Sequence, residues 1–119
     1  MIFSAFAALL LSWLQIPGGT WEVDEASAED AKLQLELALW DETNAPGANV
    51  PAWSSYTFQF QGRTIDGKKL IFINAFCSAP PETVATEWVF VLDGGKCYFD
   101  TYYDPEAKKV LSIRFNGVA

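Results

Sequence analysis

Apolar and polar residues alternate strictly from Tyr56 to Gln61, which is the period of a strand with one buried face. Four more apolar runs follow between turn-forming residues, and they cover Leu70–Cys77, Trp88–Leu92, Cys97–Tyr103 and Val110–Phe115. Together these runs predict five antiparallel strands. The second run is apolar on both faces, so we expect it at the centre of a sheet that is covered on both sides.

A helix is predicted over residues 27–42, before the first strand. Ser27 and Asp30 resemble a capping box, and strong helix formers follow them. Leu33, Leu37 and Trp40 recur at the spacing i, i+4 and i+7, so we expect them to form the buried stripe of this helix. A competing strand-like alternation is also present, in Leu33, Leu35, Leu37 and Leu39.

One helix followed by antiparallel strands predicts an α+β domain over residues 20–119, in which the helix packs on a curled sheet of four to five strands. Asp66-Gly67 separates the first two strands, and this pair is typical of a two-residue type I′ hairpin turn.

The apolar run Ile2–Leu14 precedes this domain. As a helix it would be about 20 Å long, which is short of the ~30 Å hydrocarbon core of a membrane. Residues 1–19 are therefore interpreted as a signal peptide or hydrophobic leader, with Ile16–Gly19 as the region of cleavage. A retained membrane anchor and a buried N-terminal helix remain as alternatives. A signal peptide predicts a periplasmic or secreted protein that meets the membrane only through an uncleaved leader.

Cys77 and Cys97 are the two cysteines, and the chain has no histidine, so a four-ligand zinc site is excluded. In an exported protein they are expected to form one disulfide. In a simple meander, however, they lie at opposite ends of a strand of about 17 Å, whereas a disulfide needs Cα atoms about 4.4–6.8 Å apart. Either residues 78–86 cross back and reverse the third strand, or the thiols stay unpaired.

Negative charge is concentrated in one segment of the chain. The 119 residues include 8 basic and 15 acidic side chains, for a net charge of −7. From Glu22 to Glu42 there are eight acids and one base, whereas residues 43–119 are neutral overall. This acidity argues against nucleic acid as a partner. The helix segment either docks a basic partner or is a solvated face, so an electrostatic partner is expected on the helix side.

Most catalytic chemistry is excluded because the chain lacks a Ser-His or Cys-His pair. A small hydrolase that uses carboxylates alone remains as one alternative, drawing on Asp93, Asp100, Asp104 and Glu106. Three of these acids sit in or beside predicted turns, where acids are common for structural reasons. No D-x-D-x-D calcium loop is present. We therefore assign no catalytic, cofactor-binding or metal-binding residue and expect no cofactor.

Aromatic residues provide the candidate for a binding surface. Tyr98 and Tyr102 share one face of their predicted strand, with Asp100 between them. Such a face can stack a ligand or anchor a partner, or it can simply cover the helix or the sheet edge. The leading hypothesis is a non-enzymatic exported binding or accessory domain, and its partner is an envelope protein or a small ligand.

A helix followed by an antiparallel sheet is similar to the cystatin-like fold. Ile16-Pro17-Gly18-Gly19 resembles the glycine-bearing N-terminal segment that cystatins insert into cysteine-protease clefts. The nearest matches to the two other inhibitory motifs of cystatins are Gln59-Phe60-Gln61-Gly62 and the pair Pro51 and Trp53. This resemblance implies a cystatin-like protease inhibitor as an alternative function.

The second half of the chain also resembles small exported bacterial proteins of unknown function. The matching pieces are Tyr56–Gly62, Asn74–Cys77, Asp93–Phe99, Tyr103–Pro105 and Asn116–Ala119. This resemblance implies export and a small α+β domain, and it carries no activity or site.

Overall fold

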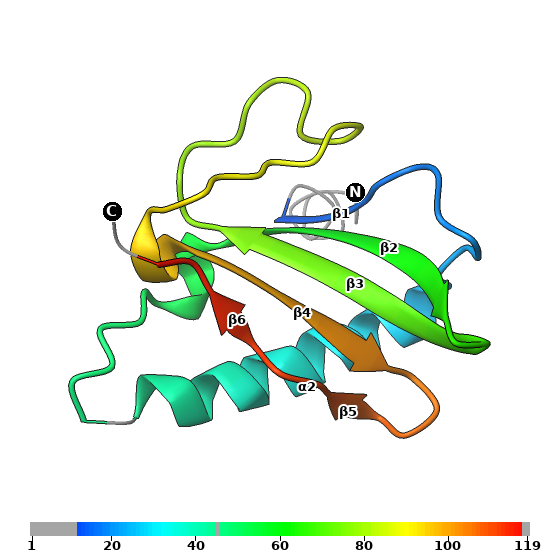
Figure 1. Ribbon diagram of the computed structural model, residues 1–119, viewed down its shortest axis with the longest axis horizontal. Coiled ribbons are helices and arrows are strands. Elements are labelled where there is room, and N and C mark those ends of the chain that lie inside the picture. The colour runs from blue at the N-terminus through cyan, green and yellow to red at the C-terminus, as the bar shows by residue number, and fades with distance from the viewer. Residues whose placement is uncertain (1–11, 45, 118–119) are drawn as a thin grey trace, which may run out of the picture.

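The computed structural model describes residues 12–44 and 46–117. Within them, one helix packs on one face of a six-stranded, mostly antiparallel open sheet (Figure 1). The elements in chain order are β1 (Trp13–Gln15), α2 (Glu25–Thr43), the 3-10 turn η1 (Trp53–Ser55), β2 (Thr57–Ile65), β3 (Lys68–Phe76), the 3-10 turn η2 (Gly95–Cys97), β4 (Tyr98–Asp104), β5 (Lys109–Val110) and β6 (Arg114–Phe115). The predicted α+β class is confirmed, but the described sheet has six strands rather than four to five.

The β2–β3 hairpin forms the centre of the sheet. The strands follow the order β1-β2-β3-β4-β5, and β6 also pairs with β4. Asp66 and Gly67 join β2 to β3 with φ angles of 52° and 77°, the two positive values that a type I′ turn requires. Residues 70–76 of β3 are all buried, as expected for a strand covered on both faces. The predicted hairpin and the central strand are therefore confirmed.

The third predicted strand, Trp88–Leu92, is not a strand, because β3 pairs directly with β4. The end of β3 therefore lies beside the start of β4, and Cys77 and Cys97 are disulfide-bonded with their Cα atoms 5.0 Å apart. The predicted disulfide is confirmed without the expected crossover. Residues 78–94 instead form a long loop on the side of the sheet opposite α2 (Figure 1).

The last predicted strand, Val110–Phe115, is divided into β5 and β6. The register of the two short strands differs by one residue, because Val110 pairs with Tyr103 whereas Arg114 pairs with Asp100. Residues 111–113 therefore lie opposite only Thr101 and Tyr102 of β4, and this extra residue interrupts the ladder. The Thr101 hydroxyl lies within hydrogen-bond distance of the carbonyl oxygens of Leu111 and Ser112, at 3.2 and 2.9 Å.

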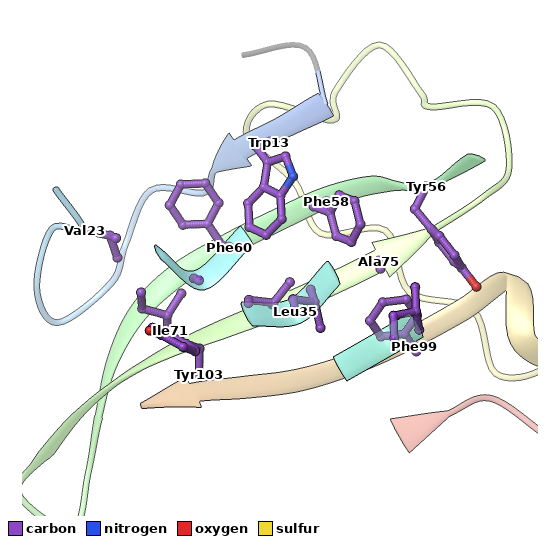
Figure 2. Close-up of a cluster of buried hydrophobic side chains, with 13 residues drawn as sticks. Trp13, Val23, Leu35, Tyr56, Phe58, Phe60, Ile71, Ala75, Phe99 and Tyr103 are labelled. Atoms are coloured by element: carbon purple, nitrogen blue, oxygen red, sulfur yellow. The ribbon is translucent and has the colours of Figure 1, made fainter. Parts of the chain in front are cut away.

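The helix packs on the sheet through a different stripe from the predicted one. Ala31, Leu35 and Leu39 are buried, and Leu35 packs with the aromatic core of the sheet (Figure 2). In contrast, Leu33, Leu37 and Trp40 are 54%, 54% and 64% exposed, so the predicted buried stripe is wrong. Both stripes fit the helical period because the leucines alternate. The sheet contacts the stripe of Ala31, Leu35 and Leu39, which are 0%, 0% and 2% exposed.

The N-terminus of α2 is capped by Asp24 rather than by the predicted Ser27. The Asp24 carboxylate accepts the backbone N–H of Ser27 at 2.7 Å, so the helix begins two residues earlier than expected.

The end of the predicted leader belongs to the folded domain. β1 pairs in parallel with β2, and Trp13 stacks on Phe58 at 4.6 Å between ring centroids (Figure 2). Ile16 is also buried. Cleavage at Gly19 would therefore remove part of the core. The rest of the leader, residues 1–11, lies outside the described residues, so the signal peptide stays a prediction.

Across residues 12–44 and 46–117, no helix combines the length and the hydropathy that spanning a bilayer requires.

Candidate functional site

The outward side of α2 carries an apolar stripe that nothing in the described chain covers. We call Leu33, Leu37 and Trp40 the outer stripe. At 3.6 residues per turn these positions fall on one line along the helix, opposite Leu35 and Leu39. All three side chains are more than half exposed. Contiguous exposed apolar residues of this kind mark interaction sites, because they gain from burial only when a partner covers them.

Carboxylates flank the outer stripe on both sides. Helical spacing places Glu29 and Glu36 along one side and Asp30 and Asp41 along the other. Asp30 has a cationic neighbour in Lys108, whose ammonium lies 3.7 Å from its carboxylate, but both side chains are at least half exposed. Such a pair contributes little, so the acidic character of this face persists.

A cleft of about 660 Å³ lies beside the outer stripe, where the N-terminal half of α2 meets β1. Its apolar part is formed by Trp13, Val23 and Phe60, and Leu33 belongs to both the cleft and the stripe. Five carboxylates and one ammonium also line it, from Asp24, Glu25, Glu29, Asp30, Glu36 and Lys32. An apolar side chain can enter this cleft while cationic neighbours meet the carboxylates.

Asp24 ties the cleft to the helix terminus. The backbone N–H of Ser27, which bonds to the carboxylate, lowers the pKa of Asp24 below its usual value. Asp24 is therefore ionised at neutral pH. It serves as the N-cap and adds negative charge to the cleft at the same time.

The predicted binding residues Tyr98, Asp100 and Tyr102 lie together on the face of β4 that points away from α2, as their spacing predicts. All three are half-buried. Asp100 pairs with Arg114, with 2.5 Å between its carboxylate and the guanidinium. Tyr102 packs against Phe72, with 5.2 Å between ring centroids. Each contacts its own domain, and their role in binding stays a prediction.

The segment Ile16–Gly19, on which the cystatin resemblance rests, lies along β2. Ile16 is 3% exposed, and the Gln61 amide donates to the Pro17 carbonyl at 2.8 Å. A Cβ atom at Gly19 would come within 2.5 Å of the Gly62 carbonyl oxygen, so only glycine permits this approach. The segment is packed along the sheet edge, and protease inhibition through it stays a prediction.

Two of the four carboxylates considered for catalysis, Asp100 and Asp104, form ion pairs within the domain. Asp104 pairs with Lys68 at 2.8 Å and accepts the backbone N–H groups of Glu106 and Ala107. The hydrogen bond from Lys68 is the main cause that lowers the pKa of Asp104. In the described part of the chain, no group of three or more Cys, Asp or Glu side chains is arranged to hold a metal ion.

Comparison with known proteins identifies no relative of this chain. No protein-family model matches the chain, and no curated protein or solved structure is significantly similar to it. The candidate site therefore rests on its own geometry.

The sequence indicates two apolar stripes on the helix, and the pattern alone does not decide which of them faces the sheet. Ala28, Ala31, Leu35 and Leu39 also follow a helical spacing, so α2 has two apolar stripes and only one can face the sheet. The cleft has no such signal, because the apolar run that contains Trp13 predicts a leader, whereas in the structure Trp13 forms one wall of the cleft.

Proposed function

We propose that the protein is a non-enzymatic exported domain that binds a basic amphipathic segment of another protein along α2. The observation that carries this proposal is the continuity of the exposed outer stripe with an acidic, partly apolar cleft. An amphipathic helix laid on this surface would bury its apolar side against Leu33, Leu37 and Trp40 and align its cations with the flanking carboxylates.

Charge complementarity favours this occupant over two others. A second copy of the chain would bring two rows of carboxylates together, and an anionic lipid surface would be repelled by the same acids. A partner with lysine or arginine beside its apolar stripe buries apolar surface and also pairs its cations with the carboxylates. The same attraction accelerates its association at low salt.

Export is part of the proposal, and the Cys77–Cys97 disulfide supports it because such bonds persist in oxidising compartments. The partner is then a periplasmic, envelope or extracellular protein. A cystatin-like arrangement also belongs to the proposal. It is supported by one helix that precedes the antiparallel strands β2 to β6 and packs across the sheet.

A synthetic amphipathic peptide tests this function. We would titrate the full chain with a helix-forming peptide of leucine and lysine, and follow binding by calorimetry. Saturable binding that weakens with salt is expected. The same peptide with glutamate in place of lysine is not expected to bind.

The variant Leu33→Gln/Leu37→Gln tests whether this binding uses the outer stripe. Both positions are exposed, so the helix should persist while affinity falls by about tenfold or more. Leu111→Gln is the matched control, because Leu111 is exposed but lies between β5 and β6. The proposal would be contradicted if the lysine peptide and the glutamate peptide bound equally well. It would also be contradicted if the free protein were a dimer that the double variant converts to a monomer.

A further inference from the structure

The loop of residues 78–94 presents a second exposed apolar surface, remote from α2. Phe90 is 64% exposed and Leu92 is 101% exposed, as much as in an isolated peptide. Trp88 anchors this part of the loop to the sheet, with its ring 5.3 Å from Phe72 and 5.9 Å from Phe90 between centroids. The chain also bends at Leu92. Leu92 is therefore the most projecting large apolar residue of the described chain.

The backbone that carries these side chains is held by amides of the sheet. The Asn74 side chain donates to the Val89 carbonyl at 2.8 Å, and the Gln59 side chain accepts the Val89 N–H at 2.9 Å. The Cys77–Cys97 disulfide closes the base of the loop. The loop thus has a fixed backbone although it belongs to no strand.

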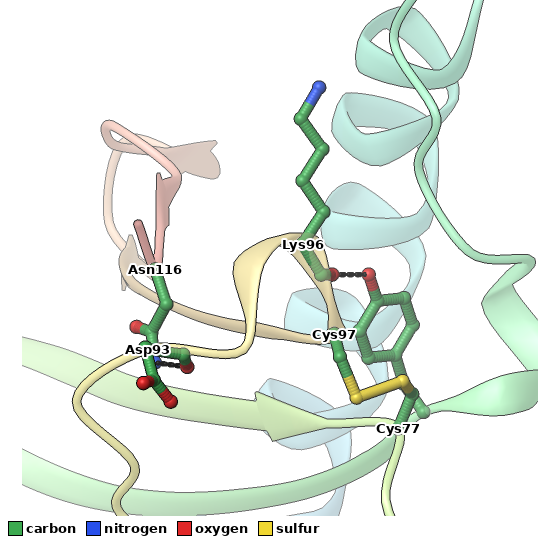
Figure 3. The surroundings of a disulfide bond; sticks show 6 residues. Cys77, Asp93, Lys96, Cys97 and Asn116 are labelled. Carbon is green, nitrogen blue, oxygen red and sulfur yellow. Dashed lines mark hydrogen bonds between the residues drawn. A yellow bond between two sulfur atoms is a disulfide. The ribbon is translucent and has the colours of Figure 1, made fainter. Parts of the chain in front are cut away.

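Asn116 holds the peptide on both sides of Leu92. Its side-chain N–H₂ group donates to the Val91 carbonyl at 2.5 Å and to the Asp93 carbonyl at 2.9 Å. Figure 3 shows Asn116 beside Asp93, on the far side of the 95–97 turn from the disulfide. One side chain therefore brackets the Leu92–Asp93 peptide bond, while the Leu92 side chain remains free to enter a pocket.

We propose that this loop binds serine endopeptidases in the manner of a substrate, with Leu92 in an apolar primary pocket and Leu92–Asp93 as the bond presented to the nucleophile. Endopeptidases recognise a projecting segment through its backbone and through one side chain in the primary pocket. A segment that is already fixed loses less conformational entropy on binding. This inference is independent of the α2 surface and uses neither residues 16–19 nor a cysteine protease.

The same restraints turn a substrate into an inhibitor. The enzyme's serine oxygen adds to the Leu92 carbonyl carbon, the bond to the Asp93 nitrogen breaks, and the serine proton passes through the enzyme's histidine to that nitrogen. Asn116 and the disulfide keep the new Asp93 amine beside the Leu92 ester. The amine can therefore attack the ester, return the proton and restore the peptide bond before water does so.

A pocket switch at Leu92 tests the proposal. The full, disulfide-bonded chain would be titrated against chymotrypsin, whose primary pocket is apolar, and trypsin, whose pocket carries an aspartate. We expect stoichiometric inhibition of chymotrypsin by the wild type. Leu92→Arg is expected to transfer inhibition to trypsin, with each inhibition constant changing by about a hundredfold or more. Phe90→Arg is the matched control because this side chain is exposed two residues away, and it is not expected to inhibit trypsin.

Asn116→Ala tests the positioning role of the amide. We expect this variant to bind chymotrypsin initially but to be hydrolysed at Leu92–Asp93 about tenfold faster or more, so that inhibition becomes temporary. Mass spectrometry would locate the cleaved bond. The proposal is overturned if the wild type does not inhibit chymotrypsin, if it is hydrolysed as fast as Asn116→Ala, or if Phe90→Arg rather than Leu92→Arg confers inhibition of trypsin.

Discussion

The outer stripe of α2 and the loop of residues 78–94 both expose large apolar side chains, yet they offer a partner different chemistry. In α2 the backbone N–H and C=O groups bond within the helix, so a partner meets side chains alone. Leu92 sits where no strand pairs, on a backbone held by Gln59, Asn74 and Asn116. The helix surface therefore fits the proposed amphipathic partner helix, whereas the loop fits the proposed endopeptidase, which binds the backbone of its substrate. The exposure of large apolar side chains alone therefore does not define what a surface binds.

The two regions also differ in what maintains them. The outer stripe depends on the backbone hydrogen bonds within α2 and on the packing of Ala31, Leu35 and Leu39 against the sheet. The loop depends on residues far away in the chain, since Asn116 reaches back 25 residues to Val91 and Val89 reaches 30 residues to Gln59. A change in these long-range contacts should therefore disturb the loop and leave the helix surface intact.

Removal of the disulfide should have the largest effect. The variant Cys77→Ser/Cys97→Ser opens a loop of sequence separation 20, which costs about 3 kcal/mol in the chain-entropy model. Urea denaturation would measure the loss. Below the unfolding transition, protease inhibition should be lost while the basic peptide still binds α2. Equal loss of both activities in the folded variant would mean that the two regions are not independent.

Gln59→Leu should have the next largest effect. Gln59 is fully buried, accepts the Val89 N–H, and donates to the carbonyls of Val84 and Glu87. Leucine leaves these groups without partners, at a cost of about 2 kcal/mol. Hydrogen exchange at the Val89 amide should accelerate, while exchange in α2 should change only as much as the global free energy of unfolding does.

Gln61→Leu is the matched control for Gln59→Leu. Gln61 points to the same side of β2, but it donates to Pro17 rather than to the loop. Inhibition of chymotrypsin that survives Gln59→Leu and disappears in Gln61→Leu would contradict the role given to the amides.

Acid should weaken the helix region before the loop. The pKa of Asp24 is lowered by its bond from Ser27, so its capping contribution is complete above about pH 4 and is lost as the pH falls through the folded pKa. Asp24→Asn keeps an N-cap without titrating and should flatten this dependence. The measurement is the exchange rate of the Ser27 amide across the acid range. A rate that is independent of pH in both proteins, after correction for intrinsic exchange, would contradict the assignment.

The sequence predicted the elements of this fold better than their faces. Alternation from Tyr56 and the Asp66-Gly67 turn predicted the central hairpin because both signals are local. The helix was predicted for the same reason. Its buried side was not, since leucines at alternate positions satisfy two stripes, and the sheet, formed from distant residues, decides between them.

The loop shows a second limit of prediction from sequence. Trp88–Leu92 has high strand propensity, but three amides from other elements satisfy its backbone and keep it outside the sheet. Nothing in the order of residues marks Asn116 as the partner of Val91 and Asp93. Likewise, the apolar run around Trp13 predicts a leader rather than β1, because a short parallel strand has no local signature.

The smallest expected effect is also the most discriminating test of the comparison. Leu37→Gln and Leu92→Gln should each change the free energy of unfolding by no more than about 0.5 kcal/mol, because both side chains are already exposed. Leu37→Gln should weaken only the binding of the basic peptide, and Leu92→Gln should weaken only the inhibition of chymotrypsin. Crossed binding assays on the two variants would measure this separation. A cost above about 1 kcal/mol for Leu37→Gln would mean that the outer stripe is already buried within the chain, which leaves the loop as the surface for a partner.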